Sequence, residues 1–296
     1  MNSSPSPDPV HADPQPHWAG ALSRALLPPL IFSSLCWLAA EINYLFFHAL
    51  AEISSIVVAF TAMVVATTSA KFAKNHFVVF VSVAIGWCAG IDLIHTLVFK
   101  GMHLLPSDSA NPATQLWLVA RYMQAVLLLL SPFALRRYFS PVILHLAFGL
   151  LASLLVASVF SGHFPVAYVD GQGLTPFKIT SELVIIALLG LFILRLSLAR
   201  AQMTPQVFYS LLAAAASMML SEAAFTQYVS VYAEANLLGH LLKIFSYWFV
   251  YIALVHNTIR EPFVMLQQEV VERQQLALER ESLLHDLGER IKEVRC

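Results

Sequence analysis

Charged residues are scarce in this sequence of 296 residues. Asp, Glu, Lys and Arg make up 12% of the chain, compared with about 25% in a typical soluble domain, whereas 58% of the residues are hydrophobic. The formal net charge is −1, so the chain lacks the basic excess that marks proteins that bind nucleic acid. This composition excludes an ordinary soluble domain and predicts a protein that crosses the lipid bilayer several times.

Cysteine is scarce, and a leader sequence and catalytic motifs are lacking. Cys36 and Cys88 lie in apolar stretches and Cys296 ends the sequence, so we expect no disulfide framework. The Pro-, Asp-, Ser- and His-rich start has no basic segment ahead of an apolar run, and we interpret residues 1–24 as a disordered cytoplasmic tail. No kinase or cyclase motif occurs, so we expect no catalysis from this chain itself.

Long apolar runs dominate the rest of the sequence. A helix needs about 20 apolar residues to cross the hydrocarbon core, and the stretches that fit are roughly 25–41, 47–70, 76–98, 113–134, 141–160, 175–195, 204–228 and 237–259. The sequence therefore predicts an all-α fold, a polytopic membrane bundle of eight transmembrane helices over residues 25–259.

Basic residues collect on one side of these spans. Cytoplasmic loops carry an excess of Lys and Arg, and here alternate connections hold Arg24, Lys71, Lys74, Arg136, Arg137, Arg195, Arg200 and Arg260. The opposite loops hold Lys100. We therefore expect both termini to be cytoplasmic.

Ionisable side chains nevertheless occur within the spans. Placing one charged side chain at the bilayer centre raises the free energy of membrane insertion by about 2.5–3.5 kcal/mol. These side chains fall in the predicted extracytoplasmic half, and many are three or four residues apart, which places each pair on one helix face. We expect these faces, with Glu41, to surround a polar cavity open to the outside. The residues expected to bind a small ligand are Glu52, Asp92, His95, Trp117, Arg121, Tyr122, Lys178, Glu182, Glu222 and Lys243. Holding helices together is the alternative role, favoured above all for Lys178 and Glu182.

Three imidazoles and two carboxylates raise a metal site as another alternative. His48, Glu52, Asp92, His95 and His240 offer ligands that suit Zn, Cu or Fe, although no H-E-x-x-H or Glu-x-x-His pair occurs. The cofactor stays open: a metal, haem, a small zwitterion and a quinone-like ring are all compatible. A membrane redox enzyme and a transporter or proton relay are the competing functions.

The composition changes after Arg260. A heptad pattern over residues 260–296 has Phe263, Val270, Ala277, Leu284 and Ile291 in its first column, and Leu266, Arg273, Arg280, Leu287 and Val294 in its second. This pattern predicts a parallel coiled coil and hence a homodimer. We interpret the two arginines as a register switch rather than the sign of a marginal solvent-exposed helix. Pro262 fits a junction at which the transmembrane helix ends and a new helix begins, and we expect the coil to lead to an output domain that this chain lacks.

Four blocks carry a family resemblance: FHALAEISSIVVAF (47–60), DLIHTLVFKGM (92–102), ANPATQLWLVARYM (110–123) and FPVAYVDGQGLTPFKITSE (164–182). Together they resemble the third class of bacterial membrane-associated sensor (MASE) domains, over essentially residues 25–296. The matching positions are His48, Glu52, Asp92, His95, Lys100, Asn111, Trp117, Arg121, Tyr122, Gly171, Gly173, Lys178 and Glu182. Phe99 and Ala167 depart from the pattern, where tyrosine and cysteine are expected.

The resemblance implies a sensor in the bacterial inner membrane. Family members are input modules of histidine kinases, as in two-component systems, or of cyclic-di-GMP enzymes. The expected function is therefore signal transduction, in which an unknown small ligand shifts a helix that leads into the coiled coil.

Overall fold

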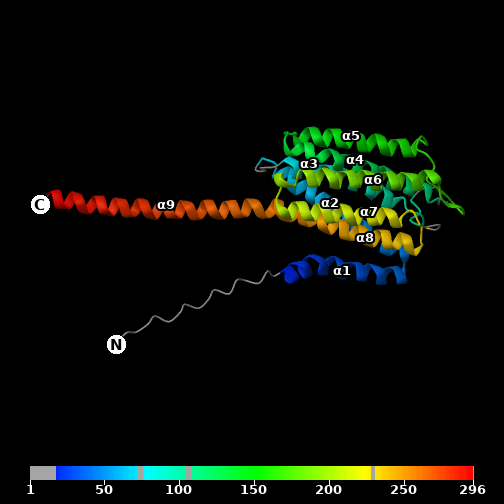
Figure 1. Cartoon of the computed structure of the whole chain (residues 1–296), viewed down its shortest axis with the longest axis horizontal. Coiled ribbons are helices and arrows are strands. Elements are labelled where there is room, and N and C mark those ends of the chain that lie inside the picture. The colour runs from blue at the N-terminus through cyan, green and yellow to red at the C-terminus, as the bar shows by residue number, and fades with distance from the viewer. Residues whose placement is uncertain (1–17, 72–75, 105–108, 228–230, 296) are drawn as a thin grey trace, which may run out of the picture.

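The computed structural model describes residues 18–71, 76–104, 109–227 and 231–295, and helices dominate it (Figure 1). Its order is α1 (Trp18–Ile42), α2 (Tyr44–Thr68), α3 (His76–Leu97), α4 (Asn111–Leu130), η1 (Ser131–Leu135), α5 (Pro141–Phe160), β1 (Tyr168–Val169), β2 (Gly173–Leu174), α6 (Pro176–Leu198), η2 (Arg200–Gln202), α7 (Pro205–Ala224), α8 (Glu234–Val250), η3 (Tyr251–His256) and α9 (Asn257–Arg295). Within the described residues, eight helices are long and apolar enough to cross a membrane. The predicted all-α membrane bundle is confirmed. Helix α1 begins at Trp18, earlier than the expected start near residue 25.

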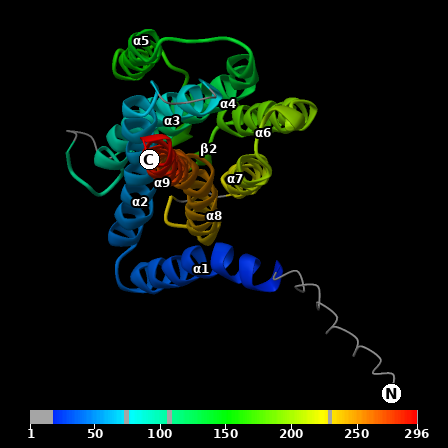
Figure 2. The ribbon, with the colours of Figure 1, turned by 90° about the vertical axis from the view of Figure 1, so that its left-hand side faces the viewer.

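Helix α3 is the most buried of the spans and packs against α2, α4 and α5. Helices α1 and α5 lie at opposite edges of the bundle (Figure 2), and their many exposed leucines form a surface suited to lipid. Small residues allow close approach between helices, as is usual in membranes: a Cβ atom at Gly86 would lie 2.4 Å from the sulfur of Met63.

A two-stranded antiparallel hairpin, β1 with β2, covers one end of the bundle. We call this end, which lies opposite the end from which α9 projects, the distal end (Figure 1). The Asn111 side-chain oxygen accepts hydrogen bonds from the backbone N–H groups of Ala167 (2.9 Å) and Tyr168 (3.0 Å). Gly171 and Gly173 have φ angles of 82° and 93°, a region that favours glycine. Several residues that carry the family resemblance therefore shape this cover.

Asp170 ties the hairpin to the preceding distal loop. Its carboxylate accepts hydrogen bonds from Lys100 Nζ and Ser109 Oγ, both at 2.7 Å. These two donors hold the pKa of the Asp170 carboxyl below its usual value.

Helix α8 continues into α9 without a break. The π-helical turn η3 joins the two, and α9 then runs on through Pro262 and projects from the bundle (Figure 1). The expectation that a helix ends and another begins at Pro262 is therefore wrong: the irregular turn precedes the proline. A π-helical turn is rare and often marks a functional position.

Candidate functional site

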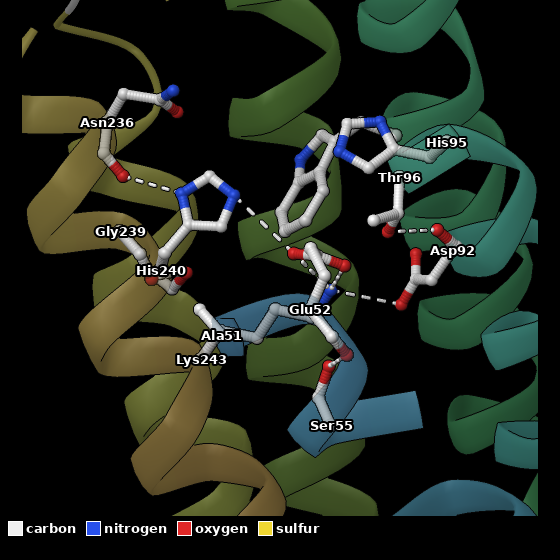
Figure 3. Close-up of polar contacts among 12 residues, drawn as sticks. Ala51, Glu52, Ser55, Asp92, His95, Thr96, Asn236, Gly239, His240 and Lys243 are labelled. Carbon is white, nitrogen blue, oxygen red and sulfur yellow. Dashed lines mark hydrogen bonds and ion pairs between the residues drawn. The ribbon is translucent and has the colours of Figure 1, made fainter. Parts of the chain in front are cut away.

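Buried charges near the distal half form one connected network, which involves three helices besides α8. The ammonium group of Lys243 on α8 donates to both oxygens of Glu52 on α2, at 2.9 and 2.7 Å, and to Oδ2 of Asp92 on α3, at 3.1 Å (Figure 3). The same Asp92 oxygen accepts from Nη2 of Arg121 on α4 at 2.5 Å. Each of these four residues is at most 1% exposed. Two acids and two bases therefore alternate in direct contact, so their charges compensate one another.

Trp117, one turn before Arg121 on α4, lies beside both cations. The Arg121 guanidinium carbon is 4.8 Å and the Lys243 nitrogen 4.7 Å from the centre of the indole ring, within the range of a cation–π interaction. The indole N–H donates to Oε2 of Glu222 on α7 at 3.3 Å. Trp117 thus extends the network to a fifth helix.

Lys178 and Glu182 form an ion pair one turn apart on α6, and both are fully buried. The Lys178 nitrogen lies 6.0 Å from the centre of the Phe225 ring. Within the described residues, no hydrogen bond joins this pair to the network, and its self-contained geometry fits the structural role expected from the sequence. Counting the pair, the buried carboxylates in the described part of the chain (Glu52, Asp92, Glu182, Glu222) exceed the buried Arg and Lys cations there (Arg121, Lys178, Lys243) by one.

Three histidines gather on the distal side of this network. His48, His95 and His240 come from α2, α3 and α8, and with Glu52 they offer ligand atoms that all lie within 4.8 Å of one another. The ring centre of His48 lies 5.4 Å from that of His95 and 4.8 Å from that of His240. Phe99, at the position where tyrosine was expected, stacks on His48 with 3.7 Å between ring centres.

Several buried polar atoms of the site have no hydrogen-bond partner among the described residues. They include Asp92 Oδ1, Glu222 Oε1 and Arg121 Nε, as well as ring nitrogens of His48 and His95. Leaving a buried donor or acceptor unsatisfied costs about 1–3 kcal/mol. Water, an ion or a ligand bound at this site would satisfy these buried polar atoms.

A small cavity reaches the histidines from the distal side. Its lining includes His95, Lys100, Trp117, Asn236 and His240, and its volume is about 360 Å³ with its open mouth counted. The expected cavity among the charges is therefore displaced: the charges touch one another directly, and the space lies beside the histidines.

The structure brings together most, but not all, of the residues expected at the site. Tyr122 is half-buried and packs against the hydrophobic core, and Glu41 is exposed at the end of α1; neither joins the network in the described part of the chain. Sequence reasoning missed Gln124, which accepts from Nη1 of Arg121, and Asn236, whose carbonyl oxygen lies 2.7 Å from Nδ1 of His240. The i,i+3 spacing of Arg121 and Gln124 was a signal that could have identified the first.

Comparison with known proteins gives one informative match. The model of the family MASE3, described as a membrane-associated sensor domain, matches residues 39–262. The matched range contains the charge network, the histidines and the hairpin. Neither the curated proteins nor the solved structures give a significant match.

Proposed function

The chain belongs to the MASE3 family of membrane-associated sensor domains, and from this we propose that it is the input module of a signalling protein in the bacterial inner membrane. A small ligand or cofactor binds beside the buried charges, and α8 passes the change through a coiled coil to a kinase or cyclic-di-GMP output domain. Both termini face the cytoplasm in this proposal, so the distal end faces outward.

The position of Lys243 is the observation that carries the proposal. Its ammonium group joins α8 to Glu52 of α2 and Asp92 of α3, and the same helix continues through η3 into α9. A change in the charge network therefore acts directly on the element that leaves the bundle. Helix shifts of about 1–2 Å are enough for switching between states.

A ligand can drive such a shift only if it binds the two states unequally. The Glu52 carboxylate provides a means, because Lys243 Nζ contacts both of its oxygens while His240 Nε2 lies 3.4 Å from one of them. A ligand that engages this carboxylate competes with Lys243. The loosened Lys243 then allows α8 to move relative to α2 and α3.

Exposed apolar side chains along α9 support the homodimer. Leu266, Val270, Leu284 and Leu287 are 47–59% exposed in the single chain, and all four occupy the two core columns of the heptad pattern. A second copy of α9 would bury them.

A reporter fusion tests the sensory role. The chain is joined ahead of a histidine-kinase output module, and Lys243→Met and Arg121→Ala are compared with the wild type. We expect both variants to insert normally but to fix or reverse the output, because each breaks the network. Arg200→Gln is the control, since Arg200 lies outside the network and contacts Tyr209. Normal output and normal response in both network variants would contradict the proposal.

The dimer has its own test. Leu284→Ala with Leu287→Ala should lower cross-linking between copies in membranes, whereas Leu278→Ala should not, because Leu278 is exposed but outside the core columns. Equal cross-linking in the three proteins would remove the coiled coil from the mechanism.

A further inference from the structure

We propose that His48, His95, His240 and Glu52 bind a divalent transition-metal ion. This inference rests on the proposed function and deepens it, because it assigns a ligand class to the sensor site. The four side chains are fully or almost fully buried, belong to α2, α3 and α8, and present ligand atoms within 4.8 Å of one another.

In His95 and His240, the Nδ1 atom makes a hydrogen bond to the backbone, which leaves the Nε2 atom available as a metal ligand. Nδ1 of His95 lies 2.7 Å from the carbonyl oxygen of Ala113, and Nδ1 of His240 lies 2.7 Å from that of Asn236. A carbonyl oxygen only accepts hydrogen bonds, so Nδ1 carries the proton in each neutral ring and Nε2 keeps its lone pair. Metal-binding histidines are oriented by the same kind of contact.

The Nε2 atoms are not otherwise committed. His95 Nε2 and both ring nitrogens of His48 have no hydrogen-bond partner among the described residues, and His240 Nε2 lies 3.4 Å from Glu52 Oε1 (Figure 3). Histidines with only a packing role would be expected to have partners for these buried nitrogens. One ring nitrogen of each histidine therefore lies within 4.8 Å of a Glu52 oxygen.

Charge and donor type indicate which ion fits. Among the described residues, the buried carboxylates exceed the buried Arg and Lys cations by one (Glu52, Asp92, Glu182 and Glu222 against Arg121, Lys178 and Lys243), so one more positive charge would balance this buried region. Three imidazoles and one carboxylate suit zinc, copper or iron, whereas calcium and magnesium prefer oxygen ligands. The four ligand atoms come from three helices and lie within 4.8 Å of one another, a spacing that suits one bare ion rather than the wide flat ring of haem.

Binding would contract the site slightly. Ligands around a tetrahedral zinc ion at about 2.0–2.1 Å lie about 3.3 Å apart, and the donors here lie within 4.8 Å of one another. The largest closure needed is therefore about 1.5 Å, comparable to the helix shifts of about 1–2 Å seen in switching proteins. Since His240 belongs to α8, closure would move the helix that continues into α9. The cavity lined by His95, Asn236 and His240 gives the ion a path from the distal side.

Metal uptake by the purified chain tests the inference. The protein in detergent is stripped with a chelator, incubated with Zn²⁺, Cu²⁺, Fe²⁺ or Co²⁺ separately, and the bound metal is measured after gel filtration. We expect one ion per chain and, with Co²⁺, an absorption spectrum typical of four nitrogen and oxygen ligands. His95→Ala and His240→Ala should each lower the affinity by at least about 100-fold.

His145→Ala is the matched control. His145 is a half-buried histidine on α5 that contacts Thr67 and Trp87, away from the cluster, and its loss should leave metal affinity unchanged. Uptake of no ion by the wild type, or an equal loss in all three variants, would overturn the inference. The wild-type Co²⁺ spectrum decides the matter if an alanine variant does not fold.

The reporter fusion distinguishes a wrong metal assignment from a wrong sensory role. If no metal binds but Lys243→Met still alters output, the sensor proposal stands and the metal assignment is wrong. If metal binds but neither Lys243→Met nor Arg121→Ala alters output, the metal site stands and its link to signalling is wrong.

Discussion

Lys243 is the side chain whose loss should most destabilise the charge network. In Lys243→Met, Asp92 keeps its contact with Arg121 at 2.5 Å. The Glu52 carboxylate loses both hydrogen bonds from Lys243, and its remaining partner among the ionisable groups of the described residues is His240 Nε2 at 3.4 Å. Removing one partner of a buried ion pair costs about 3–5 kcal/mol. Individual hydrogen bonds in membrane proteins are weaker, averaging about 0.6 kcal/mol, so we expect the lower limit of about 3 kcal/mol. This loss corresponds to about two orders of magnitude in the unfolding equilibrium constant.

A double-mutant cycle isolates the interaction. Glu52→Gln combined with Lys243→Met removes both charges. We expect the double variant to lose about 2 kcal/mol less free energy of unfolding than the sum of the two single losses, because neighbouring residues couple by about 0.5–3 kcal/mol. The assay is reversible unfolding in mixed detergent, followed by circular dichroism. Lys100→Met is the matched control, since its partner Asp170 is 41% exposed and such pairs contribute about 0–1 kcal/mol. A loss in Lys243→Met no larger than that of the control, or purely additive losses, would refute the reasoning.

Two further predictions concern packing and the distal cover. Gly239→Ala should destabilise the bundle by about 1–3 kcal/mol, because the new Cβ would lie 2.4 Å from the buried ring of Phe225. At Gly90, apart from the chain neighbours and the backbone of its own helix, no atom of the described residues lies within 4 Å of a new Cβ, so Gly90→Ala should be neutral or stabilising in the same unfolding assay. The Asp170 carboxyl has a depressed pKa in the folded chain, so its stabilisation of the hairpin is present above the usual value near 4 and is lost as the pH falls further. Limited proteolysis of the hairpin should therefore accelerate below about pH 4, and Asp170→Asn should abolish this pH dependence.

The architecture was predictable because the bilayer constrains it strongly. A chain in hydrocarbon must satisfy its backbone internally, so apolar runs of sufficient length identified eight spans that the structure confirms. The cost of exposing charge to lipid likewise predicted that Asp92, Arg121 and Lys243 point inward, and each is at most 1% exposed. The spacing of His48 and Glu52 placed both on one face of α2, where both are buried.

Contacts between helices were not predictable from one sequence. Lys243 lies 151 residues from Asp92 and 191 from Glu52 along the chain, and no local pattern specifies such a pairing. Tyr122 was assigned to the site although it directly follows Arg121, and adjacent residues of a helix do not share a face. Glu41 was included for its predicted depth alone, yet a side chain at the last turn of a helix reaches solvent easily.

Competition for Glu52 makes ion binding and helix position interdependent. Lys243 occupies both Glu52 oxygens, and the inferred ion needs one of them together with His240. Removing the lysine frees the carboxylate and also removes a neighbouring positive charge, so Lys243→Met should bind the ion more tightly. Couplings of this kind are typically about 5–150-fold, and they act equally in both directions. A metal titration of Lys243→Met against wild type therefore measures how strongly the ion disfavours the Lys243–Glu52 contact. Unchanged or weaker binding would show that the ion and Lys243 do not compete for the Glu52 carboxylate.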